Sequence, residues 1–404
     1  MNIRLALDWW PVGQGLFSSG RLHRDNQVVS WVYDCGTASA DRHLLDSLHD
    51  FGQEHTAAGA DGIDFAVLSH FDRDHVSGFE RLVARHPIHM VLLPYIPLWQ
   101  RLVIAAQQGV AAEDVLFRFF VNPAGYLFSI PGQQIGEVVF VPPAGSEGGG
   151  DGEFPSAPAP AGPRPSALKA EYGGPPDSER PTWTANPFDD PRVRYLAKGG
   201  RLLLPFWEFV PYNDADLSAR ADAAFRAAAA PLIQKLVRPS RGSPAVALKK
   251  LRSLYDKTFG KTSSRRNQIS LFLYSGPLDH SSRADVDGWD PRFEPGVWER
   301  FAQLSTGDGM LETPERLTAM IRHYGSSTRM TKMGIFQVMH HGAKSSWHPG
   351  VAERLCPVAS IISSEPSDKR YRHPHAEVLR DFWSHGAVQV DSVERMRMDL
   401  DIYI

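Results

Sequence analysis

The chain has 404 residues, 42% hydrophobic and 22% charged, with a formal net charge of −3 at pH 7, a composition that excludes wholesale disorder and gives no global sign of a polyanionic partner. The two cysteines, Cys35 and Cys356, are too few for a disulfide framework, so we expect reduced thiols and a cytoplasmic location. Because no apolar run reaches the roughly 20 residues of a spanning helix and the first residues do not resemble a secretion signal, we expect no membrane partner.

The first part of the chain, residues 1–143, alternates strand-like and helix-like segments. Short apolar runs predict strands at residues 28–33, 63–68, 90–93 and 137–141, and helical periodicity predicts helices at 43–54, 79–85 and 97–108. This alternation is typical of an α/β fold.

The middle of the chain, residues 144–266, has a different composition and is predicted to be an insertion. Residues 144–194 are rich in Gly, Pro, Ser and Ala, which predicts a flexible, partly disordered loop. Residues 195–266 contain an aromatic segment at 202–212 and helical patterns at 216–237 and 244–259, and α/β character resumes at 268–274. We therefore predict one domain over residues 1–404 that carries this insertion.

A cluster of metal-competent side chains directly follows the apolar run at residues 63–68. It comprises His70, Asp72, Asp74 and His75. A buried strand that ends in a tight loop would present all four at one spot, where they can hold a divalent metal.

Three other predicted strand ends, one before this cluster in the chain and two after it, carry similar side chains beside glycine. These are Asp34, Asp308, and the pair formed by His340 and His341. We expect such strands to deliver their polar side chains to the same sheet edge.

The second half of the insertion is strongly basic. Between residues 235 and 266 there are ten Lys or Arg residues and one acid, Asp256. A solvated helix face is the ordinary explanation of such a run, but beside a metal site that cleaves phosphoesters it favours an arm that contacts a nucleic-acid backbone. The predicted contacts are Lys249, Lys250, Arg252, Lys257, Lys261, Arg265 and Arg266, with Tyr255 and Phe259 as candidates for base stacking.

The motifs together resemble the metallo-β-lactamase superfamily, whose signature is HxHxDH; here Asp72 takes the place of its second histidine. More narrowly, they resemble the hydrolase domain of ComEC-type DNA-uptake proteins, with a VGQG turn at residues 12–15, an HHGS-like turn at 340–346 and a late YGHPH-like segment at 371–375. The resemblance covers about residues 3–143 and 267–404. It implies an αββα metallo-β-lactamase sandwich with a long, partly disordered insertion.

The same resemblance implies a centre for one or two divalent ions. His70 and Asp72 would serve the first ion, Asp74 and His75 the second, Asp308 would bridge them, His341 would be the late ligand, and Asn267 would replace the middle histidine of the family. His340 would contact phosphate or exchange roles with His341, and Asp34 would orient a ligand from behind. Asp72 and Asn267 favour Mn²⁺ or Mg²⁺, with Zn²⁺ as an alternative.

Such a centre activates water, so catalysis requires no side-chain nucleophile. The catalytic candidates are Asp74, His340, Lys344, His373 and His375. His373 or His375 would supply the proton for the leaving oxygen, and Lys344 or Arg372 would neutralise the non-bridging oxygens.

The resemblance favours a metal-dependent phosphodiesterase, above all a DNA nuclease. Soluble relatives of this type resemble regulated effector nucleases, some of them associated with proteases and NTPases of bacterial antiviral systems, which implies a regulatory protease or NTPase partner. Two alternatives stay open: hydrolysis of a small substrate such as a cyclic nucleotide or lactone, and a non-catalytic binding or regulatory module with a vestigial metal site. The sequence leaves the oligomeric state and the choice between DNA and RNA open.

Overall fold

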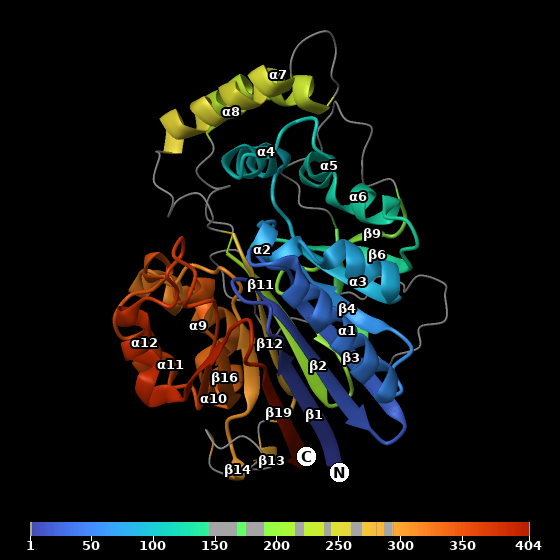
Figure 1. Ribbon diagram of the computed structural model, residues 1–404, viewed down its shortest axis with the longest axis vertical. Helices are drawn as coiled ribbons and strands as arrows, with labels where there is room; N and C mark the ends of the chain where they lie inside the picture. The colour runs from blue at the N-terminus through green and yellow to red at the C-terminus, as the bar shows by residue number, and fades with distance from the viewer. Residues whose placement is uncertain are drawn as a thin grey trace.

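In the computed structural model, the chain forms a mixed α/β fold built on two mixed β-sheets (Figure 1). The structure describes residues 2–144, 168–174, 190–214, 222–237, 244–259, 269–279, 281–286, 293 and 295–403. Within these ranges, no helix combines the length and the apolar character needed to cross a membrane.

The first sheet runs from antiparallel strands at one side to parallel strands at the other. Across the described residues it has 11 strands in the order β14-β13-β19-β1-β2-β3-β4-β5-β6-β9-β8. Their bounds are β1 Asn2–Trp9, β2 Phe17–Arg24, β3 Gln27–Cys35, β4 Ile63–Val67, β5 Ile88–Pro94, β6 Ile135–Val141, β8 Tyr172–Gly173, β9 Val193–Leu196, β13 Arg283–Val286, β14 Gly296–Trp298 and β19 Met396–Tyr403. The parallel strand β4 is buried throughout, whereas antiparallel β19 buries alternate residues, as expected when one face of a sheet is solvated.

The second sheet is also mixed. Among the described residues it has eight strands in the order β18-β17-β16-β15-β12-β11-β10-β7. Their bounds are β7 Lys169–Ala170, β10 Leu202–Leu203, β11 Trp207–Asn213, β12 Leu271–Pro277, β15 Ala302–Ser305, β16 Met333–Gln337, β17 Ala359–Ser363 and β18 Ala387–Val390. Strands β15 to β18 are parallel to one another, and β12 pairs antiparallel with both β15 and β11.

One buried apolar cluster contains side chains from both sheets, so the sheets pack on each other. The ring of Phe209 on β11 lies 4.9 Å from that of Trp31 on β3 and 4.7 Å from that of Phe65 on β4. Edge-on contacts of this kind bury large apolar surfaces and add about 0.5–1.5 kcal/mol each beyond area burial. The inner face of each sheet is therefore fixed in register against the other.

Helices pack on the sheet faces through two further apolar clusters. The helices of the cluster on the first sheet are α1 Asp41–Ala57, α3 Phe79–Arg85, α4 Leu98–Gln107, α5 Val115–Val121 and α6 Pro123–Ser129, and α7 Ala223–Val237 and α8 Pro244–Phe259 join this cluster by packing on α4. Those on the second are α9 Pro314–Tyr324, α10 Met330–Lys332, α11 Val351–Leu355 and α12 Ala376–Phe382. Helices α7 and α8 lie above α4 at the top of Figure 1, and α9, α11 and α12 lie at its left.

The segment expected to be an insertion contributes strands to both sheets. Strand β9 pairs parallel with β6, and β11 pairs with β12 along its whole length. Within the expected flexible loop at 144–194, residues 168–174 and 190–194 are described and supply β7, β8 and the start of β9, which corrects that expectation for those residues. Their order has a physical cause, because Leu168 and Tyr172 are buried in the core between the sheets. The rest of that loop lies outside the described residues.

Candidate metal centre

The candidate centre lies where parallel strands of both sheets end. Asp34 is the next-to-last residue of β3. His70 to His75 follow β4, the parallel neighbour of β3 in the first sheet. Asp308 follows β15, and the 3-10 turn Met339–Gly342 follows the parallel neighbour β16 in the second sheet. The sequence-based expectation of one sheet edge is therefore wrong: the side chains come from the carboxyl ends of two sheets, which the sandwich brings together.

The loop after β4 is held by close backbone contacts. The short helix α2, Arg73–Val76, begins directly after Asp72, and the N–H of Leu16 donates to the carbonyl of Asp74 at 3.1 Å. A Cβ atom at Gly36 would lie 2.5 Å from the carbonyl carbon of His75, so only glycine permits this approach. The glycine after Cys35 thus fixes where Asp74 and His75 are placed.

Asp34 is a hydrogen-bond hub that orients two imidazoles. Its Oδ1 accepts from the N–H of Ser69 at 2.7 Å, and its Oδ2 accepts from Ser69 Oγ at 2.6 Å and from His75 Nδ1 at 2.7 Å. Since the single hydroxyl proton of Ser69 goes to Asp34, Ser69 Oγ must accept from His70 Nδ1, 2.8 Å away. When they are neutral, both His70 and His75 therefore carry their proton on Nδ1 and present a lone pair at Nε2.

This role separates Asp34 from the direct metal donors. The carboxylate of Asp34 lies close enough to His70 and His75 to form a metal-sized group with them. Its oxygens, however, are already occupied by three donors. A carboxylate that anchors Nδ1 of a ligating histidine is a recurrent feature of metal sites, so the orienting role of Asp34 stays a prediction that this geometry allows.

His341 is anchored in the same way from the second sheet. Its Nδ1 donates to the carbonyl of Ser363 at 2.6 Å, which leaves a lone pair at Nε2. That atom lies 3.2 Å from Nε2 of His75 and 3.4 Å from Oδ2 of Asp74. When both imidazoles are neutral, two acceptor nitrogens and a carboxylate face one another, and either a proton on one imidazole or a cation between them would satisfy these lone pairs.

The carboxylate of Asp308 lies between two pairs of imidazoles. Its Oδ1 lies 3.1 Å from His75 Nε2 and 3.5 Å from His341 Nε2. Its Oδ2 lies 3.4 Å from His70 Nε2 and 3.4 Å from His340 Nε2. Because each oxygen faces a different pair, Asp308 has the geometry that a bridging carboxylate needs.

The pKa values of the buried groups in this cluster are set by burial and by the charges of neighbouring groups, which act in opposite directions. Burial alone would raise the pKa of Asp308, but the imidazoles around it hold that pKa well below its usual value. Burial would lower the pKa of His75, but the carboxylates of Asp308 and Asp34 raise it well above normal. Burial raises the pKa of Asp72 to about 6, whereas contacts with His341 and His75 outweigh burial at Asp74 and lower its pKa to about 2.

The residues fit a divalent cation. Nε2 of His70 and Oδ1 of Asp308 are buried and have no hydrogen-bond partner among the described residues. Two groups of donors can hold an ion, His70 with Asp72 and Asp74, and Asp74 with His75 and His341, each with its ligand atoms within 4.8 Å of one another. Nitrogen and carboxylate donors of this kind suit several divalent metals, so the donor set itself does not select one.

The other histidines expected at the site lie next to these donors. The ring centroid of His373 lies 5.9 Å from that of His340, 6.3 Å from that of His341 and 5.1 Å from that of His375. His340 contacts the Ser346 hydroxyl through Nδ1 at 2.7 Å; a hydroxyl can donate or accept, so the contact does not fix its tautomer. His340 belongs to neither donor group.

Lys344 lies at the rim of the site. Its side chain is 60% exposed, and its ammonium lies 3.4 Å from Oε1 of Glu377. Its backbone N–H donates to Nδ1 of His375 at 3.3 Å. The guanidinium of Arg372, the alternative cation, donates to the carbonyl of Lys369 at 3.3 Å.

The expected nucleic-acid contacts are only partly within the described residues. Lys249, Lys250, Arg252 and Lys257 are exposed on α8. Lys261, Arg265 and Arg266 lie outside the described residues, as does Asn267, the expected middle metal ligand. The expectation that Tyr255 stacks on bases is wrong, because its side chain is 1% exposed and packs beside Trp99. The side chain of Phe259 lies outside the described residues.

Two residues near the metal donors were not expected from the sequence. The hydroxyl of Ser69 connects Asp34 to His70 through two hydrogen bonds. The position of Ser69 directly before the motif is the only signal in the sequence that could have revealed this role. Gln108, at the carboxyl end of α4, donates through Nε2 to Oδ1 of Asp72 and to the carbonyl of Phe71 at 3.3 Å. Gln108 lies 36 positions from Asp72 in the chain, so sequence alone gives no signal for this contact.

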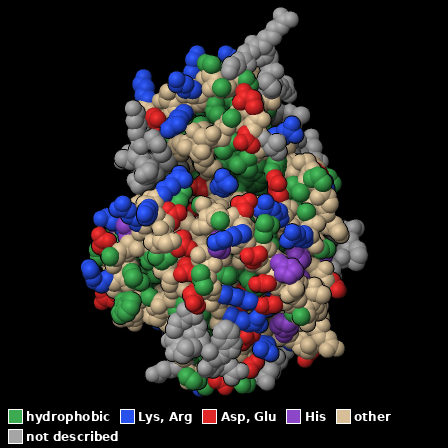
Figure 2. Space-filling model, in the orientation of Figure 1, with side chains coloured by type: hydrophobic (Ala, Val, Ile, Leu, Met, Phe, Trp, Pro, Cys, Tyr) green, Lys and Arg blue, Asp and Glu red, His purple; other side chains and the backbone are tan. Residues whose placement is uncertain are grey.

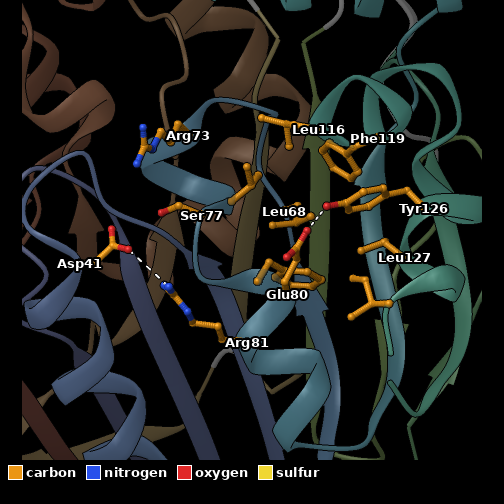
Figure 3. Close-up of a pocket in the computed structure, with 13 residues that line it drawn as sticks. Asp41, Leu68, Arg73, Ser77, Glu80, Arg81, Leu116, Phe119, Tyr126 and Leu127 are labelled. Atoms are coloured by element: carbon orange, nitrogen blue, oxygen red, sulfur yellow. Dashed lines mark hydrogen bonds and ion pairs between the residues drawn. The ribbon is translucent and has the colours of Figure 1, made fainter. Parts of the chain in front are cut away.

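A cavity of about 300 Å³ borders α2 (Figure 3). It is lined by Asp41, Leu68, Arg73, Val76, Ser77, Phe79, Glu80, Arg81, Leu116, Phe119, Tyr126, Leu127 and Ile130. Its polar groups pair with one another: Arg81 lies 3.4 Å from Asp41, and the Tyr126 hydroxyl contacts Glu80. None of the metal-donor residues lines it, so this cavity is distinct from the candidate centre.

The sequence matches no protein-family model and no curated protein.

Proposed function

We propose that this protein is a metal-dependent phosphodiesterase that cleaves DNA. The observation that carries the proposal is the pair of Nε2 atoms of His75 and His341, 3.2 Å apart, beside the carboxylates of Asp74 and Asp308. Both imidazoles have Nδ1 committed to an acceptor. A buried set of lone pairs that converge in this way is stable only around positive charge.

The fold supports the same proposal. Two mixed sheets pack on each other, with helices on their faces. We propose that this is the αββα sandwich of the metallo-β-lactamase type, in which the metal centre lies at the edge shared by the two sheets. The HxDxDH motif follows β4, and Asp308 and His341 follow parallel strands of the other sheet.

The donor set divides naturally between two ions. His70 and Asp72, with Oδ2 of Asp308, would hold one, and Asp74, His75 and His341, with Oδ1 of Asp308, would hold the other. Bound there, divalent metals would supply positive charge to a phosphodiester and acidify water for attack on phosphorus. Three carboxylates among the donors favour the harder ions Mn²⁺ and Mg²⁺ over Zn²⁺.

The basic helix α8 favours a polyanionic substrate over a small one. Lys249, Lys250 and Lys257 are exposed on it, and Figure 2 shows Lys and Arg side chains gathered over this part of the molecule. Arg252 donates to the carbonyl of Ala106 on α4 at 3.4 Å, and Gln108, directly after the last residue of α4, donates to Asp72. The proposed DNA-binding helix and the metal donors therefore belong to one packed unit.

The test is cleavage of supercoiled plasmid and of bis(p-nitrophenyl) phosphate, each with Mn²⁺, Mg²⁺ or Zn²⁺. We expect both substrates to be cleaved, with plasmid preferred at low salt. The matched pair of variants is Asp308→Asn, which should lose activity, and Asp64→Asn, which should retain it. Asp64 is also a buried aspartate, but its carboxylate accepts from the N–H of Ser30 at 2.7 Å.

Each other outcome identifies a different alternative. Cleavage of the small diester alone would support a small-molecule hydrolase. A purified protein with neither bound metal nor activity under any of the three cations would support a non-catalytic module.

A further inference from the structure

The glycine-rich turn at residues 12–15 holds a wholly buried glutamine. Gln14 is 0% exposed. Its backbone N–H donates to Ser39 Oγ at 2.9 Å, and its carbonyl accepts from the N–H of Ala38 at 2.6 Å. These contacts hold the turn against the segment after β3 without help from the side chain. The side-chain amide of Gln14 is therefore not needed to hold the turn and can bond to other residues.

That side chain connects two residues near the end of the chain. Its Oε1 accepts from the backbone N–H of Glu365 at 3.3 Å, and its Nε2 lies 3.4 Å from Nδ1 of His373. A backbone N–H can only donate, so the amide atom that faces it must be the oxygen. The atom that faces His373 is then the NH₂ group, which donates to Nδ1.

This hydrogen bond determines where His373 carries its proton. An imidazole whose Nδ1 accepts must have its proton on Nε2 when it is neutral. A protonated imidazolium has no acceptor nitrogen, so a ring whose Nδ1 accepts from Gln14 is neutral. The Nε2–H group of His373 makes no hydrogen bond to any residue in the described part of the chain.

The site thus contains imidazoles of two kinds. His70, His75 and His341 carry the proton on Nδ1 and present lone pairs at Nε2. His373 has the opposite tautomer and presents an N–H. The first kind can bind a metal, whereas the second can only donate a hydrogen bond.

We propose that Gln14 is a positioning residue that holds His373 as a neutral Nε2–H donor, and that His373 uses this group to bind an oxygen of the phosphodiester. The catalytic part rests on the proposed function. It replaces the expectation that His373 delivers a proton, because a neutral imidazole N–H is far too weak an acid for that role. A neutral imidazole can stabilise a developing oxyanion instead.

The tautomer can be measured without any metal or substrate. The probe is ¹⁵N NMR of protein labelled at histidine nitrogens, with His373→Gln to assign the resonances. We expect His373 to be protonated at Nε2 and unprotonated at Nδ1. In Gln14→Glu, one carboxylate oxygen still accepts from Glu365 N–H and the other accepts from Nδ1–H, so the tautomer should reverse.

A wild-type His373 protonated at Nδ1 would overturn the assignment, whether or not Gln14→Glu folds. A folded Gln14→Glu protein with an unchanged His373 tautomer would overturn the role of Gln14. Thermal unfolding of each variant establishes that it is folded.

The kinetic test uses Gln14→Met with Gln53→Met as its matched control. Gln53 also contacts an imidazole, His49 at 2.9 Å, but on the exposed face of α1. We expect Gln14→Met to lower kcat on the diester by about 10–100-fold, as for other residues that orient a catalytic group. We expect His373→Gln to lower it by about 10²–10³-fold and the double variant to fall no further.

The experiments distinguish failure of the proposed function from failure of the role of Gln14 and His373. Wild-type protein without phosphodiesterase activity would remove the proposed function and the catalytic role of His373, while the NMR result would still decide the tautomer. Active wild-type protein with full kcat in His373→Gln would remove this inference alone.

Discussion

The side-chain amide of Gln108 donates to Oδ1 of Asp72 and so joins the end of α4 to the metal motif. The same helix receives Arg252 of α8 at the carbonyl of Ala106. A single helix therefore contacts both a proposed metal ligand and the proposed DNA-binding helix.

Replacing Gln108 with leucine should weaken metal binding in a pH-dependent way. Burial holds the pKa of Asp72 at about 6, and removal of a donor to the carboxylate raises it further. Since the ionised form binds metal, affinity should fall more at about pH 6 than at about pH 8, where Asp72 is ionised in both proteins. The measurement is calorimetric titration with Mn²⁺. Gln107→Leu is the control, because Gln107 has no hydrogen-bond partner among the described residues; an equal loss in both variants would contradict the prediction.

Asp34→Asn should lower metal affinity although Asp34 is not among the proposed metal ligands. The carboxylate fixes Nδ1–H of His75 directly and Nδ1–H of His70 through Ser69. Loss of such an orienting group typically costs about 10–100-fold in affinity. Metal content after dialysis against a graded chelator series measures this loss. Asp64→Asn changes a buried aspartate away from the centre and should bind metal normally.

His341→Ala and His340→Ala should separate the two histidines of the HHG turn. His341 has an anchored Nδ1 and belongs to a donor group, whereas His340 belongs to neither group. We expect His341→Ala to lose the ion held with Asp74 and His75, and His340→Ala to retain it. Metal analysis by mass spectrometry gives the number of ions per chain. Loss of the same ion in His340→Ala would exchange the roles of the two residues.

Replacing Lys249, Lys250 and Lys257 together with glutamine should weaken DNA binding and its dependence on salt. If each lysine contacts one phosphate, the slope of log affinity against log salt should fall by about 1 per lysine. Fluorescence anisotropy with a DNA duplex across a salt series measures the slope. The control replaces Arg322, Arg354 and Arg380, three exposed cations on α9, α11 and α12, and should leave the slope unchanged. Equal effects of the two triple variants would indicate a nonspecific effect of net charge.

A charge network that ties α1 to the first sheet should make stability depend on pH. Glu54 accepts from Arg397 at 2.7 Å and from Arg395 at 2.9 Å, and Arg395 also donates to buried Asp8 at 2.6 Å. Burial opposes ionisation of Glu54, but these arginines outweigh it and lower its pKa from 4.5 to about 2. A lowered folded-state pKa stabilises the fold above the unfolded value, and this contribution disappears as pH falls from 4.5 through 2.

The corresponding variant is Glu54→Gln. Near neutral pH it should lower the free energy of unfolding by about 2 kcal/mol, the scale of hydrogen bonds to charged groups. The difference from wild type should shrink as the pH drops through that window. Urea unfolding at a series of pH values tests this, with the exposed Glu394→Gln as control. A difference that is constant across the window would show that the charge of Glu54 is not responsible.

Periodicity predicted the helices at 79–85 and 244–259 with the bounds that the structure has, and the parallel strands β3 to β6 within a few residues. Those elements have simple apolar patterns because one face, or both, packs in a core. Strand β2 gave no such pattern, since it buries Ser18, Ser19 and Arg21. Its polar groups are satisfied by tertiary contacts, such as the hydrogen bond that Ser18 Oγ donates to the carbonyl of Tyr33 at 3.2 Å. The hydrophobic pattern of neighbouring residues does not predict such contacts.

Strand β11 shows a second limit of the sequence. Pro211 argues against a strand inside a sheet, yet β11 pairs with β12 through residue 213. The partner on its other side, β10, pairs only with Glu208 and Phe209, so at Pro211 no ladder bond is lost. The cluster of His and Asp side chains was visible in the sequence because these residue types follow strand ends, and the structure brings them close enough to hold a metal ion. The contacts of Ser69, Gln108 and Gln14 were not visible, because ordinary polar residues acquire these roles only through tertiary proximity.

The antiparallel pairing of β1 with β19 joins residues 2–9 to residues 396–403, and the centre joins His75 to His341, which are 266 positions apart. During synthesis the ribosome releases His70 to His75 long before Asp308 and His341 exist. Contacts over such distances form late and slowly. A prematurely terminated chain that stops before Asp308 would carry four of the six proposed donors and would lack Asp308 and His341. Under the proposed function, such aborted translation products would lack nuclease activity, so the order in which the polypeptide is made would protect the cell from them.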